Sequence, residues 1–166
     1  MDPVKKSSDE VSKQLAALGE SDTDNAQRFA TRFGDRVLYT VGRGWLIFDG
    51  KRWRPSAQLQ CMELAKKAAR LIRDEAKYLN DERDAAGRAK FAAASLSKGA
   101  LDRMLDLAKG LLLVEDSKLD ADPWLYNTAT GTIDLRTGRR AKHDPRDLLT
   151  KMTPVDADSR AKCPCS

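Results

Sequence analysis

The stretch of residues 122–151 constrains the fold more than any other part of the chain. It predicts two short strands, residues 124–127 and 132–135, which are joined by a tight turn. A second turn at Thr137-Gly138 leads into a basic return, and Asp144-Pro145 begins a final helical turn. The chain has no glycine loop of the G-x-x-x-x-G-K-[ST] type, so we do not expect it to hydrolyse ATP by itself.

A small antiparallel meander is expected earlier in the chain. Asp49-Gly50 is a strong signal for a two-residue hairpin turn, and strand-forming residues lie on both sides of it. The meander carries Trp45 and Trp53, and a two-layer domain of this size needs aromatic side chains to fill its core. The three strands are expected at residues 36–41, 45–48 and 51–54.

The spacing of apolar residues predicts three helices. The first begins at Thr23-Asp24 and ends at Gly34, with Arg28 and Arg32 on its outer side. The second runs from about residue 58 to 80, or as far as 89, and the third from residue 95 or 97 to about 109. The inward stripe of the second helix consists of Leu59, Met62, Ala65, Ala69, Ile72, Ala76 and Leu79.

Helices and strands are segregated along the chain and do not alternate as βαβ units. This order predicts an α+β fold in which two main helices pack against short antiparallel hairpins in a single domain. The domain is expected at residues 23–155, after a flexible acidic leader at residues 1–22 and before a tail or linker at residues 156–166. The apolar residues 111–114 are expected to form a short buried strand, and residues 151–155 a last one.

The formal net charge of +5 indicates an anionic partner, and the cations occur in three sets. Cations on one edge of a helix can follow a phosphate backbone, and cations around an aromatic ring can hold a single strand whose bases stack on the ring. The predicted DNA-binding residues are Arg43, Lys51, Arg52, Trp53 and Arg54 in the meander, Lys66, Arg70, Arg73 and Lys77 on the second helix, and Arg136, Arg139, Arg140 and Lys142 after the last hairpin.

Each set also has an interpretation without DNA. The helical cations can form a solvated face with local counter-charges, Glu63 and Lys67 being spaced to pair with each other. Trp45 and Trp53 can be core residues, and the last set can be a solvated hairpin end. A docking module is therefore the main alternative, with residues 111–114 and the acidic block 111–135 meeting a neighbouring domain or subunit.

Catalysis and metal binding are weakly supported by the sequence. A small metal-dependent nuclease could use His143 with Asp120, Asp122 or Asp134, but these residues are more typical of turns and helix caps. Of the cysteines, Cys61 is expected to be a buried thiol, and Cys163 with Cys165 does not complete a zinc site. No catalytic residue, metal or cofactor is therefore assigned to the chain.

The sequence has no signal peptide and no apolar run of membrane-spanning length. We therefore expect a cytoplasmic protein without membrane contact.

The segments DNAQRFATRFGDRVLYT, GWLIFDGKRW and DPWLYNTATGTIDLRTGRRAKHDPRDLLTKMTPV resemble one particular family of domains. This domain precedes the superfamily-three helicase in phage and plasmid primase–helicases and in the related poxvirus primase–helicase. The resemblance covers roughly residues 24–164. The pieces WLIFDGKRW and NTATGTIDLRTG carry it together, since either alone would be weak.

The resemblance implies a role in starting the replication of a mobile element, such as a phage, prophage or plasmid. A primase part would lie upstream and a ring-forming helicase downstream, and the domain between them would link the two and help guide single-stranded or forked DNA. The partners implied are DNA, the helicase domain and neighbouring subunits. ATP and Mg²⁺ are expected to bind only the helicase part, which this chain does not contain.

Overall fold

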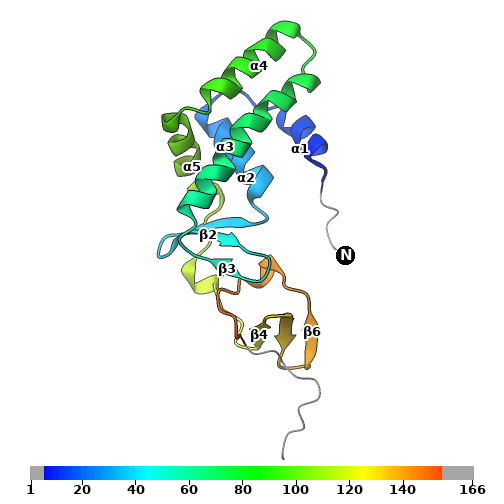
Figure 1. The fold of residues 1–166 in the computed structure, drawn as a ribbon, viewed down its shortest axis with the longest axis vertical. Helices are drawn as coiled ribbons and strands as arrows, with labels where there is room; N and C mark the ends of the chain where they lie inside the picture. Colours follow the sequence, from blue (N-terminus) through cyan, green and yellow to red (C-terminus); the bar gives the residue numbers. More distant parts are fainter. Residues whose placement is uncertain (1–5, 155–166) are drawn as a thin grey trace, which may run out of the picture.

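Helices form one end of the molecule, and two small antiparallel sheets follow each other toward the other end (Figure 1). The computed structural model describes residues 6–154. This arrangement confirms the α+β fold expected for a single domain. In the described residues no helix is both long enough and apolar enough to cross a membrane.

The described residues contain five α-helices, where the spacing of apolar residues predicted three. The helices are α1 (Ser8–Leu15), α2 (Asp22–Phe33), α3 (Gln58–Glu75), α4 (Glu82–Ala94) and α5 (Lys98–Leu111). The strands of the first sheet separate α2 from α3, and three single 3₁₀ turns occur at Ala76–Tyr78, Asp116–Lys118 and Pro145–Asp147.

Helix α1 lies in the region that was expected to be a flexible leader. Ser7 caps the helix by accepting a hydrogen bond from the backbone of Glu10, whose carboxylate accepts one from the Ser7 N–H in return. The side chains of Ser12 and Leu15 are buried. Capping and burial together explain why residues 8–15 form an ordered helix here.

The expected long second helix is in fact two helices. Helix α3 ends at Glu75, and Asp81 caps α4 by accepting a hydrogen bond from the backbone N–H of Arg83. The two helices fold back on each other as a hairpin (Figure 1). The predicted set of inward-facing residues on this helix is therefore only partly correct, since Leu59 at the start of α3 is 80% exposed.

A buried ionic cluster joins α2, α3 and α4. Arg28 was expected on an outer face, but its side chain is fully buried and donates to both carboxylate oxygens of Glu75, at 2.9 and 2.8 Å. Arg88 of α4 donates to the same carboxylate at 2.5 Å. Arg28 and Arg88 also donate to the carbonyls of Gly19 and Leu18, at 2.9 and 2.8 Å. The cluster therefore ties the helical hairpin to α2 and to the loop before it.

The first sheet has the strand order β1-β2-β3 and confirms the expected meander. Strand β3 is shorter than predicted, because the carboxylate of Asp49 accepts hydrogen bonds from the backbone of Lys51 and Arg52 and holds both in the turn. Val41, expected on the inner face, is 80% exposed. The strands are β1 (Val37–Thr40), β2 (Gly44–Phe48) and β3 (Trp53–Arg54).

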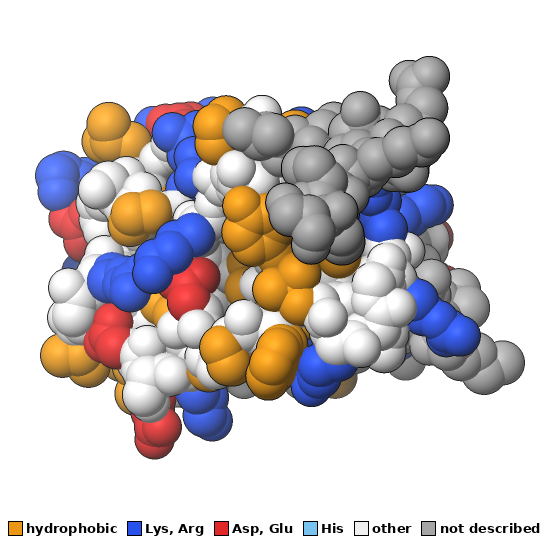
Figure 2. All heavy atoms as spheres, turned by 90° about the horizontal axis from the view of Figure 1, so that it is seen from below, with side chains coloured by type: hydrophobic (Ala, Val, Ile, Leu, Met, Phe, Trp, Pro, Cys, Tyr) orange, Lys and Arg blue, Asp and Glu red, His pale blue; other side chains and the backbone are white. Residues whose placement is uncertain are grey.

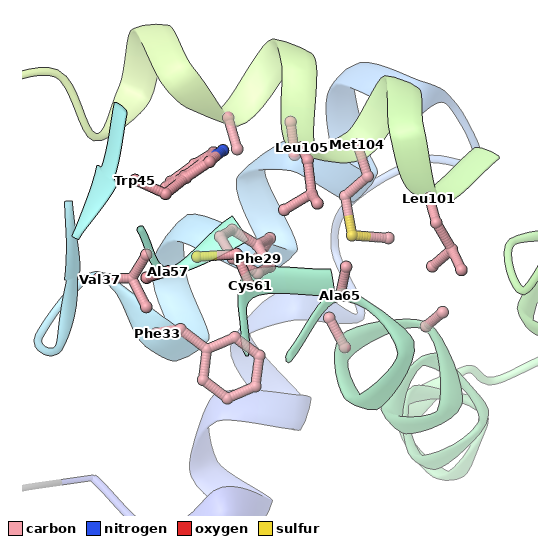
Figure 3. Packing of buried hydrophobic residues seen from close by; sticks show 14 residues of the cluster. Phe29, Phe33, Val37, Trp45, Ala57, Cys61, Ala65, Leu101, Met104 and Leu105 are labelled. Atoms are coloured by element: carbon pink, nitrogen blue, oxygen red, sulfur yellow. The ribbon is translucent and has the colours of Figure 1, made fainter. Parts of the chain in front are cut away.

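The main core lies between the first sheet and helices α2, α3 and α5. The Trp45 ring packs edge-on against Phe29, at 5.9 Å between ring centroids, while Met104 and Leu105 approach Phe29 from α5 (Figure 3). Cys61 is fully buried in this core, as expected. Burial raises the pKa of its thiol to about 12, so the group stays protonated and unreactive.

Residues 111–114 run beside β1 but do not form the expected buried strand. The N–H of Tyr39 donates to the carbonyl of Leu112 at 2.9 Å, and the N–H of Val114 donates to the carbonyl of Tyr39 at 2.8 Å. Leu111 and Leu113 are 51% and 53% exposed. The segment borders the sheet at its edge, so alternate side chains point outward.

The second sheet confirms the hairpin predicted from residues 122–135, and the basic return adds a third strand. The order is β4-β5-β6, with β4 at Leu125–Thr128, β5 at Gly131–Asp134 and β6 at Arg139–Ala141. A second, smaller core of Leu38, Leu46, Trp53 and Leu119 lies on the side of the first sheet that faces this part of the chain.

Residues 148–153 connect the two sheets. The N–H of Trp53 donates to the carbonyl of Leu149 at 2.8 Å, and the N–H of Thr153 donates to the carbonyl of Asn127 at 2.9 Å. The described part of residues 151–155 is extended without forming the strand that was expected, and Val155 lies outside the described residues, as do residues 156–166.

Candidate nucleic-acid interface

The second sheet presents two aromatic side chains to solvent. Trp124, which directly precedes β4, is 51% exposed, and Tyr126, the second residue of β4, is 48% exposed. The N–H of Leu135 donates to the carbonyl of Trp124 at 2.8 Å, which extends the ladder to this residue. Tyr126 lies opposite Ile133, which lies opposite Arg140 on β6. One face therefore carries an open ring and a guanidinium group, and a second open ring directly precedes β4.

Turn chemistry holds this face in place. Thr128 closes the β4–β5 turn by donating its hydroxyl to the carbonyl of Gly131 at 2.8 Å. A side chain at Gly131 would overlap the carbonyl oxygen of Ala141, so only glycine lets β6 approach here. Gly138 has a positive φ of 68° in the β5–β6 turn, and its N–H donates to the carbonyl of Asp134 at 2.7 Å.

The third basic set lies on and beside this sheet. Arg139, Arg140 and Lys142 are exposed on β6 and directly after it. Arg140 donates to the hydroxyl of Thr130 at 3.0 Å, and Arg136 forms ion pairs with Asp134 at 2.9 Å and with Asp122 at 3.3 Å. The hydrogen bond with Asp134 is the largest cause that raises the pKa of Arg136, and the same contact lowers the pKa of Asp134. Arg136 therefore has a structural role in the turn.

A cavity of about 340 Å³ adjoins Tyr126, between β4 and residues 149–153. Tyr126 and Lys151 both line it. The side-chain amide of Asn127 donates to the carbonyls of Lys51 and Lys151, at 3.0 Å each, and thereby holds these two lysines near each other. Lys151 was not among the predicted residues, and only this bridge from a buried Asn reveals its position.

Part of the basic set in the first sheet also lies near Lys151. Arg43 donates to the hydroxyl of Thr150 at 3.2 Å, beside Lys151, and lies 4.0 Å from the carboxylate of Asp116. Lys51 and Arg54 are exposed, whereas Arg52 is half-buried. Arg43 and Lys51 of the meander set thus lie near residues 150–151.

Trp53 does not fit the role predicted for it. It is only 3% exposed, and its indole N–H donates to the carbonyl of Pro145 at 2.8 Å. Its ring is part of the smaller core and has no open face on which a base could stack. Trp124 and Tyr126 have the exposed rings that were expected at Trp53.

The predicted DNA-binding residues on helix α3 lie away from the second sheet. Helix α3 runs from the first sheet toward the end of the molecule opposite the second sheet (Figure 1). Lys66 and Lys77 pair with Glu63 and Asp74, at 2.6 and 3.9 Å, while Arg70 and Arg73 are exposed without an ion pair among the described residues. The three basic sets therefore do not form one surface.

Viewed from the end that carries the second sheet, hydrophobic side chains gather near the centre of the surface, and lysines and arginines are spread around them (Figure 2). Aromatic and aliphatic groups next to scattered cations are the composition that a stacking surface requires. A uniformly basic face would instead indicate contacts with phosphates alone.

The residues considered for a nuclease are held by other contacts. Nε2 of His143 donates to the carbonyl of Thr128 at 2.9 Å, and the carboxylate of Asp120 accepts hydrogen bonds from the backbone and hydroxyl of Thr150. Asp122 and Asp134 both pair with Arg136. In residues 6–154 no three His, Cys, Asp or Glu side chains come together as a metal site would require.

A cavity of about 830 Å³ forms a groove between β1, residues 111–114 and residues 142–148. Leu112, Leu113 and Val114 line it, together with Trp53 at one end. Its charged edge consists of Lys142, His143, Asp144 and Arg146. The half-exposed Leu111 and Leu113 give it an apolar surface that the domain itself does not cover.

A sequence model of the protein family described as "D5 N terminal like" matches residues 26–166 of the chain. No curated protein matches the sequence.

Proposed function

Because the chain belongs to the family of N-terminal domains of D5-type primase–helicases, we propose that it is an accessory domain that binds single-stranded DNA during replication. It would pass the strand between the primase and helicase parts and carry out no chemistry itself. ATP and Mg²⁺ would act at the helicase part. The observation that carries this proposal is the pair of exposed rings, Trp124 and Tyr126, at the second sheet.

The geometry suits a single strand better than a duplex. Residues two apart on a strand are separated by about 7 Å, so successive bases of an extended strand can each reach one ring. Bases in a duplex are stacked on each other and do not offer their faces. Stacking on an aromatic side chain contributes about 1–3 kcal/mol per base and depends little on sequence.

The cations around the rings would hold the phosphates. Arg140 lies on the same face as Tyr126, across the sheet, and Lys142 follows two residues later, whereas Arg139, opposite Asp134, lies on the other face. Lys151 lines the cavity beside Tyr126. Because these contacts release counterions, affinity should fall as the salt concentration rises.

Fluorescence anisotropy with a labelled oligothymidine at two salt concentrations tests the proposal. Replacing Trp124 and Tyr126 together by Ala should weaken binding about 5-fold to 150-fold for each ring removed, since stacking contributes about 1–3 kcal/mol per base. Leu135→Ala is the matched control, because Leu135 is 53% exposed beside Trp124 but has no ring. It should bind like the original protein.

A second pair of variants separates stacking from charge. Arg140→Gln with Lys151→Gln should reduce the slope of log affinity against log salt concentration by about 0.7 for each phosphate that these side chains neutralise. The proposal is wrong if the protein does not bind the oligonucleotide at low salt, or if the double ring variant binds as tightly as the original protein.

The groove beside residues 111–114 supports a second candidate function, docking of the helicase part or a neighbouring subunit. Leu111→Asp and Leu113→Asp would place charges on its apolar surface and should abolish co-elution with the helicase part. Leu107→Asp is the control, because Leu107 is 45% exposed on the same helix as Leu111 but does not line the groove. Equal co-elution of all three variants would exclude this groove as the docking site.

A further inference from the structure

A small basic pocket lies between helices α1, α2 and α3, on elements other than the second sheet. Its volume is about 230 Å³. Four cationic residues line it, together with the hydroxyl-bearing Ser8 and one carboxylate, Asp35. The four cations are Lys6, Arg32, Arg36 and Lys67.

Arg32 is the unusual member of this set. Its side chain is only 4% exposed, and Nη2 donates to the hydroxyl of Ser12 at 3.1 Å. Nε is buried and has no hydrogen-bond partner among the described residues. A buried donor on a charged group is costly to leave unpaired, so this nitrogen indicates that something else accepts from it.

The protein's own carboxylates do not neutralise Arg32. The closest is Glu75, at 3.9 Å, and Glu75 already accepts shorter hydrogen bonds from Arg28 and Arg88, at 2.8 and 2.5 Å. One carboxylate is thus shared by three guanidinium groups. Desolvation by burial lowers the pKa of Arg32 more than Glu75 and Asp74 raise it. An anion in the pocket would supply the missing negative charge.

Arg36 and Lys67 are also available to an anion, whereas Lys6 donates to the side-chain carbonyl of Gln14 at 2.9 Å. The guanidinium of Arg36 lies over the Phe33 ring, 5.2 Å from its centroid, and forms no ion pair among the described residues. Lys67 was expected to pair with Glu63, but the Glu63 carboxylate pairs with Nζ of Lys66 instead, at 2.6 Å. Phe33 thus holds Arg36 in place without neutralising it.

From this pocket we propose a phosphate-binding site in which Arg32 and Arg36 donate to the phosphate oxygens and Lys6 and Lys67 add charge. At about 230 Å³ the pocket is smaller than a typical small-molecule site, so it takes the phosphate group while the rest of the ligand stays outside. The phosphate is either part of a DNA backbone or part of a nucleotide. The site goes beyond the proposed function, because it lies on different elements.

Titration calorimetry of the full chain with inorganic phosphate, at constant ionic strength, tests the site. The original protein should bind phosphate saturably. Arg36→Gln with Lys67→Gln should weaken this binding at least about tenfold, because these side chains are not part of the buried Glu75 cluster and their loss should leave the fold intact. Arg73→Gln with Lys77→Gln on α3 removes the same charge away from the pocket and should have little effect.

The absence of saturable binding, or equal binding by the Arg36 and Lys67 double variant, would overturn the site. Competition then identifies the source of the phosphate. Displacement of inorganic phosphate by oligothymidine assigns the site to DNA, and displacement by dAMP alone assigns it to a nucleotide. The Trp124 and Tyr126 double variant should still bind phosphate, so failure of this site and failure of the stacking surface can be told apart.

Discussion

The helical part buries some of its charged and aromatic side chains, whereas the second sheet exposes its aromatic ones. In the helical part Arg28 and Glu75 are buried and pair with each other, and the rings of Phe29 and Phe33 are buried and contact each other. In the second sheet Trp124 and Tyr126 leave about half of their surface open to water. The first part is therefore built as a support, whereas the second keeps large apolar area uncovered, which is typical of a binding surface.

The largest effect on stability should come from disrupting the buried ionic cluster in the helical part. Replacing Glu75 by Gln leaves Arg28 buried without a counter-charge, and leaves Arg88 with only the partly exposed Glu20, at 3.3 Å. Loss of one partner of a buried ion pair costs about 3–5 kcal/mol. The free energy of unfolding, measured by urea denaturation with circular dichroism, should fall by that amount.

Glu63→Gln is the control for this change. Glu63 lies on the same helix and pairs with Lys66, but its side chain is 68% exposed. Exposed pairs contribute about 0–1 kcal/mol, so the stability should hardly change. If the two variants are equally stable, the buried cluster does not support the fold and the contrast between the two parts disappears.

A smaller effect should distinguish the two cores, each of which contains one tryptophan that is 3% exposed. Trp53 donates to the carbonyl of Pro145 at 2.8 Å, whereas the indole N–H of Trp45 has no hydrogen-bond partner in the described residues. Both Trp→Phe changes remove similar volume. Only Trp53→Phe also leaves a carbonyl unpaired, so it should cost about 1 kcal/mol more than Trp45→Phe.

Thermal and urea unfolding of the two Phe variants measure this difference. The hydrogen bond of Trp53 fixes the segment that leads from the second sheet to the first. A larger decrease in stability for Trp45→Phe would mean that packing in the main core outweighs this connection.

The parts of the structure that could be predicted from the sequence are those set by neighbouring residues. Asp49-Gly50 and the β4–β5 turn give the hairpins because turn chemistry acts over a few positions. The buried Cys61 follows from helical spacing. These features depend little on distant parts of the chain.

Features set by distant contacts were missed. Arg28 looks like a surface residue until its partner, 47 residues later in the chain, is known. The burial of Trp53 was one of the two interpretations that the sequence left open, but the exposure of Trp124 depends on which layer covers its ring, and a short strand carries no signal for this. The bridge from Asn127 to Lys51 and Lys151 likewise exists only in the folded chain.

The smallest effect concerns two carboxylates in the segments beside the second sheet, and it depends on pH. Burial of Asp120 opposes its ionisation most strongly, but hydrogen bonds from the Thr150 hydroxyl and from the backbone of Thr150 and Lys151 together hold its pKa below the ordinary value. Burial, and after it the charge of Asp144, raises the pKa of Asp147. The two groups should therefore affect stability with opposite signs.

For Asp120 the stabilisation is fully present above the ordinary carboxyl pKa of about 3.9 and is lost as the pH falls through the lower folded-state value. Asp120→Asn should thus be less stable than the original protein at neutral pH, with the difference vanishing in acid. For Asp147 the stabilisation is present below the ordinary pKa and is lost as the pH rises through the higher folded-state value. Asp147→Asn should therefore be more stable than the original protein at neutral pH.

Both changes should be about 1 kcal/mol or less, because the carboxylates are partly exposed and screened by solvent. Urea unfolding of both variants between acid and neutral pH measures them. Opposite signs at neutral pH would show that the Asp120 contacts, and not merely a carboxylate near this sheet, hold the segment that carries Lys151 beside Tyr126. Equal signs would remove that explanation for how the stacking surface is supported.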